Sequence, residues 1–333
     1  MNMIEMAMGY FRSRVLCAAA RLGVADALAG GAREVAEIAA VCHADPESLY
    51  RLLRALAAIG VTAETAPGSF VLTAFGEPLR KDAPGSVWPS VVFWSDLLAE
   101  NWSYLTECVQ SGDTAAHLME QQGVQSRWSK DPHAQSIFRA VMGTAPVEDY
   151  LPIVRSWDFS HSRVVADLGG GGGSLIRAVL QSDPHLQGML VDRPAAIEEA
   201  KPRFEAEGLL DRCRMIGADL TEEVPAGADV YLMKHVLHGY KDAAAIAVLR
   251  NCRQAMLPRA YLLVIEFVLL DVVSVRDSSM EMRLMSDLNM MAATGGQERS
   301  GVEWVKLLHR SGFELQRVIP ASGGMSIIEA LPV

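Results

Sequence analysis

The chain has 333 residues and half of them are hydrophobic, so it can bury a large core and is expected to form two domains. Its formal net charge of −10 argues against non-specific binding to nucleic acid or to an anionic membrane. The most apolar stretch, residues 261–273, is interrupted by Glu266 and Asp271, and the first twelve residues lack the apolar core of a signal peptide. The five cysteines form no Cys-x-x-Cys pair, which is typical of reduced thiols in a cytoplasmic protein with no membrane partner.

Residues 1–90 show the pattern of a winged helix. Apolar residues at helical spacing predict three helices, and two short apolar runs around a turn predict a two-stranded wing. The expected helices cover residues 9–29, 35–41 and 47–59, and the expected strands cover residues 61–64 and 70–72. Asp45 followed by Pro46 suits the start of the third helix, because aspartate caps helices and proline is favoured at their first position.

A winged helix can bind DNA, but the charge of this segment favours a protein partner. Residues 1–100 contain eight Lys and Arg against eleven Asp and Glu, the opposite of what phosphate neutralisation requires. No nucleic-acid partner is therefore expected, and residues 1–90 are predicted to be a dimerisation domain. Five apolar side chains exceed what a small module is expected to bury alone, which predicts an obligate homodimer. These side chains are Leu16, Leu22, Leu53, Leu56 and Ile59.

Residues 91–155 are predicted to be a helical connector that contributes to the substrate pocket. The segment carries aromatic and methionine side chains, which are more often core residues than ligand contacts. A segment that joins a small module to a cofactor domain is, however, a common position for a substrate cleft, so both interpretations stay open. The side chains concerned are Phe93, Trp94, Trp102, Trp128, Phe138 and Met142.

Residues 156–333 alternate between strand and helix patterns, which predicts an α/β domain with a parallel sheet. The expected strands cover residues 163–168, 188–192, 214–216, 229–234 and 261–266. The expected helices lie near residues 174–181, 195–206, 243–256 and 302–311. The chain then continues with an antiparallel hairpin, built from residues 313–319 and 325–331 around a glycine turn.

The first of these strands leads into the most distinctive stretch of the chain. Asp167 and Leu168 are followed by five glycines, residues 169–173, and then by Ser174 at the expected start of a helix. Such a turn lets a nucleotide-like cofactor approach the backbone, with Gly169 and Gly171 among its contacts. The glycine spacing fits neither the dinucleotide pattern nor a phosphate-binding loop, and Asp167 would repel a pyrophosphate but tolerate a sulfonium ion. These features favour S-adenosylmethionine (SAM).

Two acids at the ends of later strands suit the same cofactor. Asp192 closes the second strand, where a carboxylate can accept hydrogen bonds from ribose hydroxyls. Asp219 follows the third strand and could accept the adenine amino group, with Leu220 against the ring. Either acid could instead cap a local turn or helix.

The fourth strand ends in Lys234, His235 and His238, which are expected to face the ligand edge of the sheet. The two histidines could suggest a metal pair, but no Cys/His cluster supplies further ligands, so no metal is expected. A histidine that takes a proton is favoured instead, with Glu266 and Glu298 as candidates to orient it.

Together these residues resemble the SAM-dependent O-methyltransferases of plant phenylpropanoid and bacterial natural-product pathways. The resemblance covers nearly the whole chain, and its motifs are residues 167–173, 191–194, 217–220, 232–238 and 295–300. It implies a class I methyltransferase Rossmann-like sheet with a C-terminal antiparallel hairpin and an N-terminal, mostly α, winged-helix dimerisation domain. It also implies a swapped homodimer.

The resemblance also implies roles for individual residues. Asp192 would bind the ribose, Asp219 and Leu220 would lie at the adenine, and Lys234 would contact the cofactor. His238 would be the general base, flanked by Glu266 and Glu298. Phe138, Met142 and Asn289 would line the acceptor pocket. The chain departs from the family at Gly239 and Tyr240, where Asp-Trp is usual, at Leu220, where Phe is common, and at Asn289, where Met or Leu is usual.

The expected activity is methyl transfer from SAM to a hydroxyl of an aromatic, polycyclic secondary metabolite, with S-adenosylhomocysteine as the second product. One alternative is a non-catalytic, SAM-binding winged-helix regulator. Another is a family relative with decarboxylase or hydroxylase activity, against which the presence of both His238 and Glu298 argues.

Overall fold

The computed structural model describes residues 2–124, 131–143 and 146–333, which form two compact units. The first unit comprises residues 1–103 and 123–141, and the second comprises residues 104–122 and 142–333. The segment expected to be a connector, residues 91–155, therefore contributes to both. Within the part of the chain that is described, no helix combines the length and the apolar character needed to cross a membrane.

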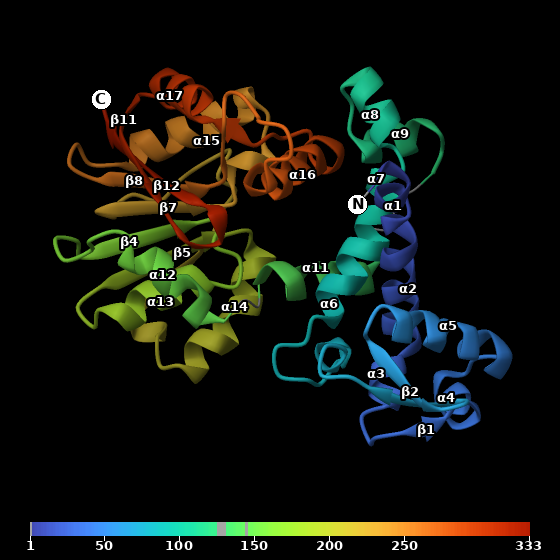
Figure 1. The fold of residues 1–333 in the computed structure, drawn as a ribbon. Helices are drawn as coiled ribbons and strands as arrows, with labels where there is room; N and C mark the ends of the chain where they lie inside the picture. Colours follow the sequence, from blue (N-terminus) through green and yellow to red (C-terminus); the bar gives the residue numbers. More distant parts are fainter. Residues whose placement is uncertain (1, 125–130, 144–145) are drawn as a thin grey trace. The chain divides into compact units, whose positions relative to one another are not determined.

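The first unit is mostly helical and contains the predicted winged helix (Figure 1). A two-residue strand adds to the wing, giving a three-stranded antiparallel sheet in the order β1-β3-β2. The elements of this unit are α1 (Met3–Ala7), α2 (Gly9–Leu22), α3 (Val24–Ala27), β1 (Arg33–Glu34), α4 (Val35–Cys42), α5 (Pro46–Ala58), β2 (Thr62–Ala66), β3 (Ser69–Leu72), η1 (Glu77–Leu79), α6 (Trp88–Val92), the π-helical turn η2 (Phe93–Leu97), α7 (Leu98–Trp102) and most of α11 (Pro132–Gly143).

The start of α5 follows the predicted chemistry, because Asp45 Oδ2 accepts a hydrogen bond from Ser48 N at 2.8 Å and Pro46 is the first helical residue. The single helix predicted over residues 9–29 is wrong. Gly23 adopts a left-handed conformation, with φ of 71°, and separates α2 from α3. Apolar spacing continues across this break, which is why periodicity alone did not reveal it.

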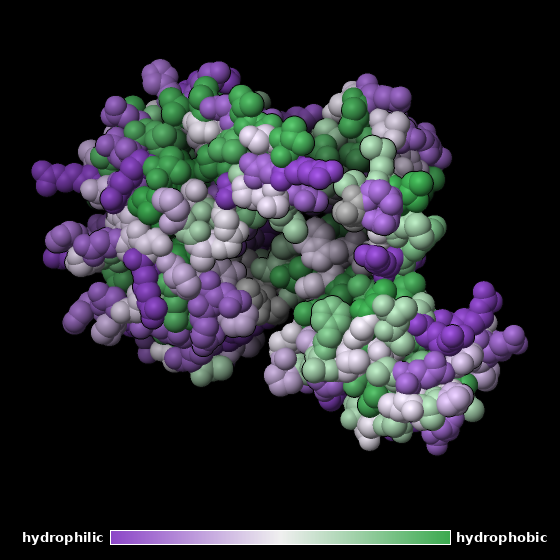
Figure 2. Space-filling model, in the orientation of Figure 1, coloured by the Kyte–Doolittle hydropathy of each residue, from purple (hydrophilic) through white to green (hydrophobic). Residues whose placement is uncertain are grey.

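The apolar residues on which the dimer prediction rested are partly buried inside the unit itself. Leu53 and Leu56 are fully buried in its core, whereas Leu22 is 36% exposed. The longest run of exposed apolar side chains in the unit lies instead on α1 and the start of α2, a region that shows green patches in Figure 2. This run consists of Met3, Ile4, Met6, Met8, Tyr10 and Phe11, and Val41, Phe75, Val87 and Trp94 are exposed elsewhere in the unit.

The second unit is built on a seven-stranded sheet with the order β11-β12-β8-β7-β4-β5-β6. Its elements are α8 (Leu105–Ser111), α9 (Ala115–Gln121), η3 (Val147–Tyr150), α12 (Leu151–Arg155), β4 (Val164–Leu168), α13 (Ser174–Ser182), β5 (Gln187–Asp192), α14 (Pro194–Ala206), η4 (Leu210–Arg212), β6 (Cys213–Gly217), β7 (Val230–Lys234), η5 (Leu237–Gly239), α15 (Asp242–Ala255), β8 (Tyr261–Glu266), β9 (Val268–Leu269), α16 (Ser278–Ala293), β10 (Arg299–Ser300), α17 (Gly301–Arg310), β11 (Phe313–Pro320), η6 (Ser322–Gly324) and β12 (Ser326–Pro332).

Strands β4 to β8 pair in parallel, and β12 and β11 add antiparallel strands at one edge, which confirms the predicted sheet and hairpin. Helices α12, α13 and α14 cover one face of the sheet, and α15 and α17 cover the other (Figure 1). The strand order reverses between β4 and β7. The loops that follow these two strands therefore diverge at the carboxyl edge, where open α/β sheets bind ligands.

Helix α16 was not predicted from the sequence. Asp277 caps it by accepting hydrogen bonds from the backbone of Ser279 and Met280, but the helix has a weakly amphipathic, methionine- and serine-rich sequence. After α16 the chain returns to the end of β8, where β10 pairs in parallel with β9 and Arg299 lies opposite Val268. This short pairing brings Glu298 and Glu266, distant in the sequence, to the same end of the sheet.

Candidate active site

The glycine turn after β4 has a backbone that other residues could not easily adopt. Gly169 has φ of 70°, and a Cβ built on it would lie 2.7 Å from Val236 Cγ2. Gly173 has φ of 76°, and its Cβ would lie 2.5 Å from Phe204 Cε2. Gly171 differs, because it has φ of 55° but no atom of the described residues lies within 4 Å of the position that a Cβ would take. The turn thus packs tightly on both sides and leaves open space at Gly171.

Asp167 lies fully buried beneath this turn. Burial and the nearby Asp192 raise the pKa of its carboxyl to about 7, against the opposing influence of Lys234. Its Oδ2 atom has no hydrogen-bond partner among the described residues, although buried polar atoms are nearly always paired. A cationic hydrogen-bond donor would satisfy this oxygen, whereas a phosphate would be repelled.

The two strand-end acids have different surroundings. Asp192 is half-buried, and its carboxylate accepts hydrogen bonds from Gly171 N at 2.7 Å and from Arg193 N at 2.6 Å. It is therefore fixed directly beside the glycine turn. Asp219 is exposed, and its Oδ1 accepts from both the backbone and the hydroxyl of Thr221. Asp219 thus serves a local turn, as the sequence allowed, while Leu220 is buried in the core behind it.

Lys234 is the last residue of strand β7 and lies near two carboxylates, those of Asp167 and Glu266. Burial lowers the pKa of its ammonium group, while the carboxylates of Glu266 and Asp167 act in the opposite direction. Its Nζ lies 5.2 Å from the ring centroid of Tyr150, within the range of a cation–π contact. Sequence reasoning gave no signal for Tyr150, because only the fold brings η3 to this strand end.

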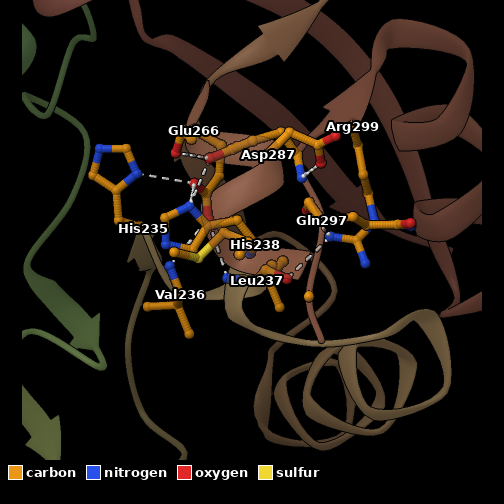
Figure 3. Close-up of polar contacts among 12 residues, drawn as sticks. His235, Val236, Leu237, His238, Glu266, Asp287, Gln297 and Arg299 are labelled. Atoms are coloured by element: carbon orange, nitrogen blue, oxygen red, sulfur yellow. Dashed lines mark hydrogen bonds and ion pairs between the residues drawn. The ribbon is translucent and has the colours of Figure 1, made fainter. Parts of the chain in front are cut away.

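The loop after β7 carries two histidines around one buried carboxylate (Figure 3). Glu266 Oε1 accepts hydrogen bonds from the backbone N–H groups of residues 236, 237 and 238, at 3.0, 3.1 and 3.3 Å. The other oxygen, Oε2, lies 3.1 Å from His235 Nδ1 and 3.4 Å from His238 Nδ1. Burial disfavours the charged form of Glu266, but the histidines and the backbone N–H groups outweigh it and lower the pKa of the carboxyl.

Glu298 is the nearer carboxylate to His238. Its Oε1 lies 2.9 Å from His238 Nδ1 and also accepts a hydrogen bond from Ser286 Oγ at 2.8 Å. Its backbone N–H donates to Asp287 Oδ1 at 2.8 Å, so α16 holds both ends of the residue. Ser286 and Asp287 were missed from the sequence because α16 itself was missed.

The segment that carries Glu298 is locked to the histidine loop. A Cβ on Gly296 would lie 2.0 Å from the His238 carbonyl oxygen, so only glycine permits this approach. Arg299 is fully buried and donates to the carbonyl of Leu237 at 3.0 Å (Figure 3). It also donates to the carbonyl of Tyr240 at 2.9 Å and to Asp242 Oδ1 at 3.0 Å. These contacts fix the distance between His238 and its carboxylate partner.

The two carboxylates set the protonation of His238. Burial opposes its charged form, but Glu266 and the hydrogen bond to Glu298 outweigh burial and raise the pKa of the imidazole. With Nδ1–H donating to a carboxylate, the neutral ring presents a lone pair at Nε2. His238 remains partly accessible, with 15% of its side chain exposed. The arrangement can therefore accept a proton from a bound hydroxyl.

The residues expected to line an acceptor pocket belong to both units. Phe138 belongs to the first unit, where its ring lies 5.9 Å from that of Phe93, and Met142 belongs to the second and is half exposed. Asn289 is buried on α16, which also carries Ser286. Trp128 lies outside the described residues.

Comparisons with known proteins identify both parts of the chain. Residues 4–81 match the O-methyltransferase dimerisation domain, and residues 102–314 match the O-methyltransferase domain. The phenazine O-methyltransferase PhzM of Lysobacter antibioticus is 35% identical over 99% of this chain and 96% of its own. An 8-amino-8-demethylriboflavin N,N-dimethyltransferase of Streptomyces davaonensis is 33% identical over 95% of this chain and 90% of its own.

A solved structure matches equally broadly. The O-methyltransferase NcsB1 from neocarzinostatin biosynthesis, in complex with SAM and 2-hydroxy-5-methyl naphthoic acid, superposes with a TM-score of 0.83 at 30% identity. The match covers 97% of this chain and 96% of that one. The predicted family, fold and enzyme class are confirmed: the chain belongs to the SAM-dependent O-methyltransferases that combine a dimerisation domain with an O-methyltransferase domain.

Proposed function

We propose that the protein methylates a hydroxyl of an aromatic, polycyclic secondary metabolite, with His238 as the general base. The observation that carries this proposal is the position of His238 Nδ1, 2.9 Å from Glu298 and 3.4 Å from Glu266, on the loop that follows a cofactor-type strand end. Relatives of this chain that act on aromatic natural products support the acceptor class.

The residues around the glycine turn suit SAM. Asp192 stands beside the open space at Gly171, where its carboxylate can accept hydrogen bonds from ribose hydroxyls. The unpaired Oδ2 of Asp167 suits the ammonium group of the cofactor, and Lys234 lies near that carboxylate. We assign Gly169 and Leu220 to the wall of the site, and give Asp219 the weaker role of an outer contact at the adenine. The cofactor supplies an electrophilic methyl group.

His238 supplies the matching base. A phenol has a pKa of about 10, so at neutral pH its oxygen is protonated and weakly nucleophilic. Nε2 of His238 would take the hydroxyl proton as the acceptor oxygen bonds to the methyl carbon and the bond from that carbon to sulfur breaks, with S-adenosylhomocysteine as the leaving group. The resulting imidazolium is stabilised by Glu298 and Glu266, whose negative charges already raise the pKa of His238. Such a base contributes about 10²–10⁴-fold to the rate, and positioning contributes the larger share, about 7–11 kcal/mol.

Contacts to the acceptor come from the predicted pocket residues. Asn289 replaces the methionine or leucine expected from the family resemblance, and it is buried on the helix that orients Glu298. An amide there suits an acceptor with a second polar substituent. Met142 and Phe138 are proposed as apolar contacts to the ring system, and the same role is assigned to Trp128.

We also propose that the protein acts as a homodimer. The matched dimerisation domain spans residues 4–81, and the longest run of exposed apolar side chains in this region lies on α1 and the start of α2. Burial of Met6, Met8, Tyr10 and Phe11 against a second copy would remove this apolar surface from water, a strong driving force for association.

A screen of aromatic acceptors tests the proposed reaction. Purified protein is incubated with methyl-labelled SAM, a chelator and matched pairs of phenols and anilines, and products are identified by mass spectrometry. We expect methylated phenols, with little transfer to the aniline partners. Preferential methylation of anilines would assign the chemistry to nitrogen. Cofactor binding without transfer to any acceptor, combined with DNA binding at physiological salt, would instead support a regulator.

A further inference from the structure

The candidate site contains a second histidine that methyl transfer does not use. The Nδ1 atoms of His235 and His238 lie close to the same oxygen, Glu266 Oε2, and the two rings stack with centroids 5.0 Å apart (Figure 3). One ligand atom from each of the three residues lies within 4.8 Å of the others. The sequence predicted Glu266 as a partner that orients a histidine, but not that both rings would lie near the same oxygen of this carboxylate.

The two spacings between the histidine nitrogens and the carboxylate oxygen match those of a zinc site. Zinc binds histidine nitrogen at about 2.0–2.1 Å in tetrahedral geometry, which places neighbouring ligand atoms about 3.3 Å apart. The two nitrogen–oxygen distances here are 3.1 and 3.4 Å. Two histidines and a glutamate are also a known zinc ligand set that leaves one position open.

The surroundings favour binding of a cation. Three backbone N–H groups hold Glu266 Oε1, so Oε2 is fixed toward the histidines, as outer-shell hydrogen bonds do in metal sites. The Oε2 atom of Glu298 is buried and has no hydrogen-bond partner among the described residues, which leaves a second carboxylate with an unused acceptor beside His238. The side chains of His235 and His238 are 28% and 15% exposed, which gives an ion access from solvent.

We propose that His235, His238 and Glu266 bind Zn²⁺ and that the bound ion inhibits methyl transfer. An ion on Nδ1 of His238 replaces the proton that this nitrogen shares with Glu298. The ring proton then resides on Nε2, which can no longer accept one from the substrate. The proposed binding rests on the ligand geometry, whereas inhibition rests on the proposed role of His238 as base.

Calorimetric titration with Zn²⁺ tests the binding. The proteins compared are the chelator-treated wild type, the His235→Asn variant and a control, His161→Gln, which changes an exposed histidine. Asparagine suits position 235 because it tolerates the left-handed backbone there, with φ of 52°. We expect one ion per chain in the wild type and the control, and binding weakened by about 10–100-fold or more in His235→Asn. Absence of binding to the wild type, or equal affinity in His235→Asn, would overturn the site.

Methyl transfer, measured on the same proteins, separates this inference from the proposed function. Zn²⁺ should inhibit the wild type and the His161→Gln control at the concentration that saturates the calorimetric site. His235→Asn, compared with its own metal-free rate, should resist this inhibition. Saturated wild-type protein that retains its metal-free rate would overturn the inhibitory role. A metal-free wild type that methylates no acceptor would contradict the proposed function while leaving the zinc site intact.

Discussion

Replacing Gly171 with alanine should weaken SAM binding by more than its moderate cost to folding explains. Gly171 has φ of 55°, and a Cβ on it would enter the open space where we place the cofactor. The left-handed backbone costs alanine about 1–2 kcal/mol in the folded protein. If a bound ligand occupies that space, overpacking adds about 1–3 kcal/mol in the complex, which corresponds to about 5–150-fold weaker binding.

Gly208→Ala is the matched control for this experiment. Gly208 has φ of 65° and likewise has no described atom within 4 Å of a built Cβ, but it lies after α14, away from the turn. Both variants should lose similar thermal stability, about 2–4 °C for each kcal/mol of strain in a domain of this size. Calorimetric titration with SAM should then show wild-type affinity in Gly208→Ala and weakened affinity in Gly171→Ala. Equal affinities would refute the placement of the cofactor at Gly171.

Three further substitutions test the surrounding contacts. Glu298→Gln removes a negative charge that raises the pKa of His238, so the acid limb of the rate–pH profile should move to lower pH. An acid limb at the wild-type pH would show that this charge does not set the pKa of the base. Arg299→Met removes hydrogen bonds to three carbonyls and to Asp242, and urea unfolding should show a loss of about 3 kcal/mol. An unchanged unfolding midpoint would contradict the stabilising role of these contacts. Phe11→Glu places a charge on the exposed face of α2 and should shift the proposed dimer toward monomer, as measured by light scattering. A molar mass equal to that of the wild-type dimer would place the dimer interface elsewhere.

The sheet was predictable because its strands are buried on both faces and so appear as continuous apolar runs. Each such run ended in a recognisable signal, such as the glycines after Leu168 or the acid at Asp192. Strong local chemistry also located α5, where Asp45 and Pro46 define the start. These features depend only on residues that are neighbours in the chain.

The parts that failed depend on contacts between distant residues. Helix α16 has weak amphipathicity, so nothing local distinguished it from a loop, and its contribution of Ser286 to the site could not be inferred. The short pairing of β9 with β10 that brings Glu298 back to Glu266 involves only two residues from each strand. The sequence likewise indicated the histidine pair and Glu266, but not that the two rings share one oxygen of that carboxylate.

The central claim is that His238 removes the acceptor proton, and single-turnover methyl transfer tests it most directly. Wild type and His238→Gln are saturated with methyl-labelled SAM, checked for equal cofactor affinity by calorimetry, and mixed with the best phenolic acceptor from the screen. We predict that His238→Gln transfers the methyl group about 10²-fold more slowly or worse, with cofactor affinity nearly unchanged. Transfer at the wild-type rate by His238→Gln would contradict the claim and assign the deprotonation to another group.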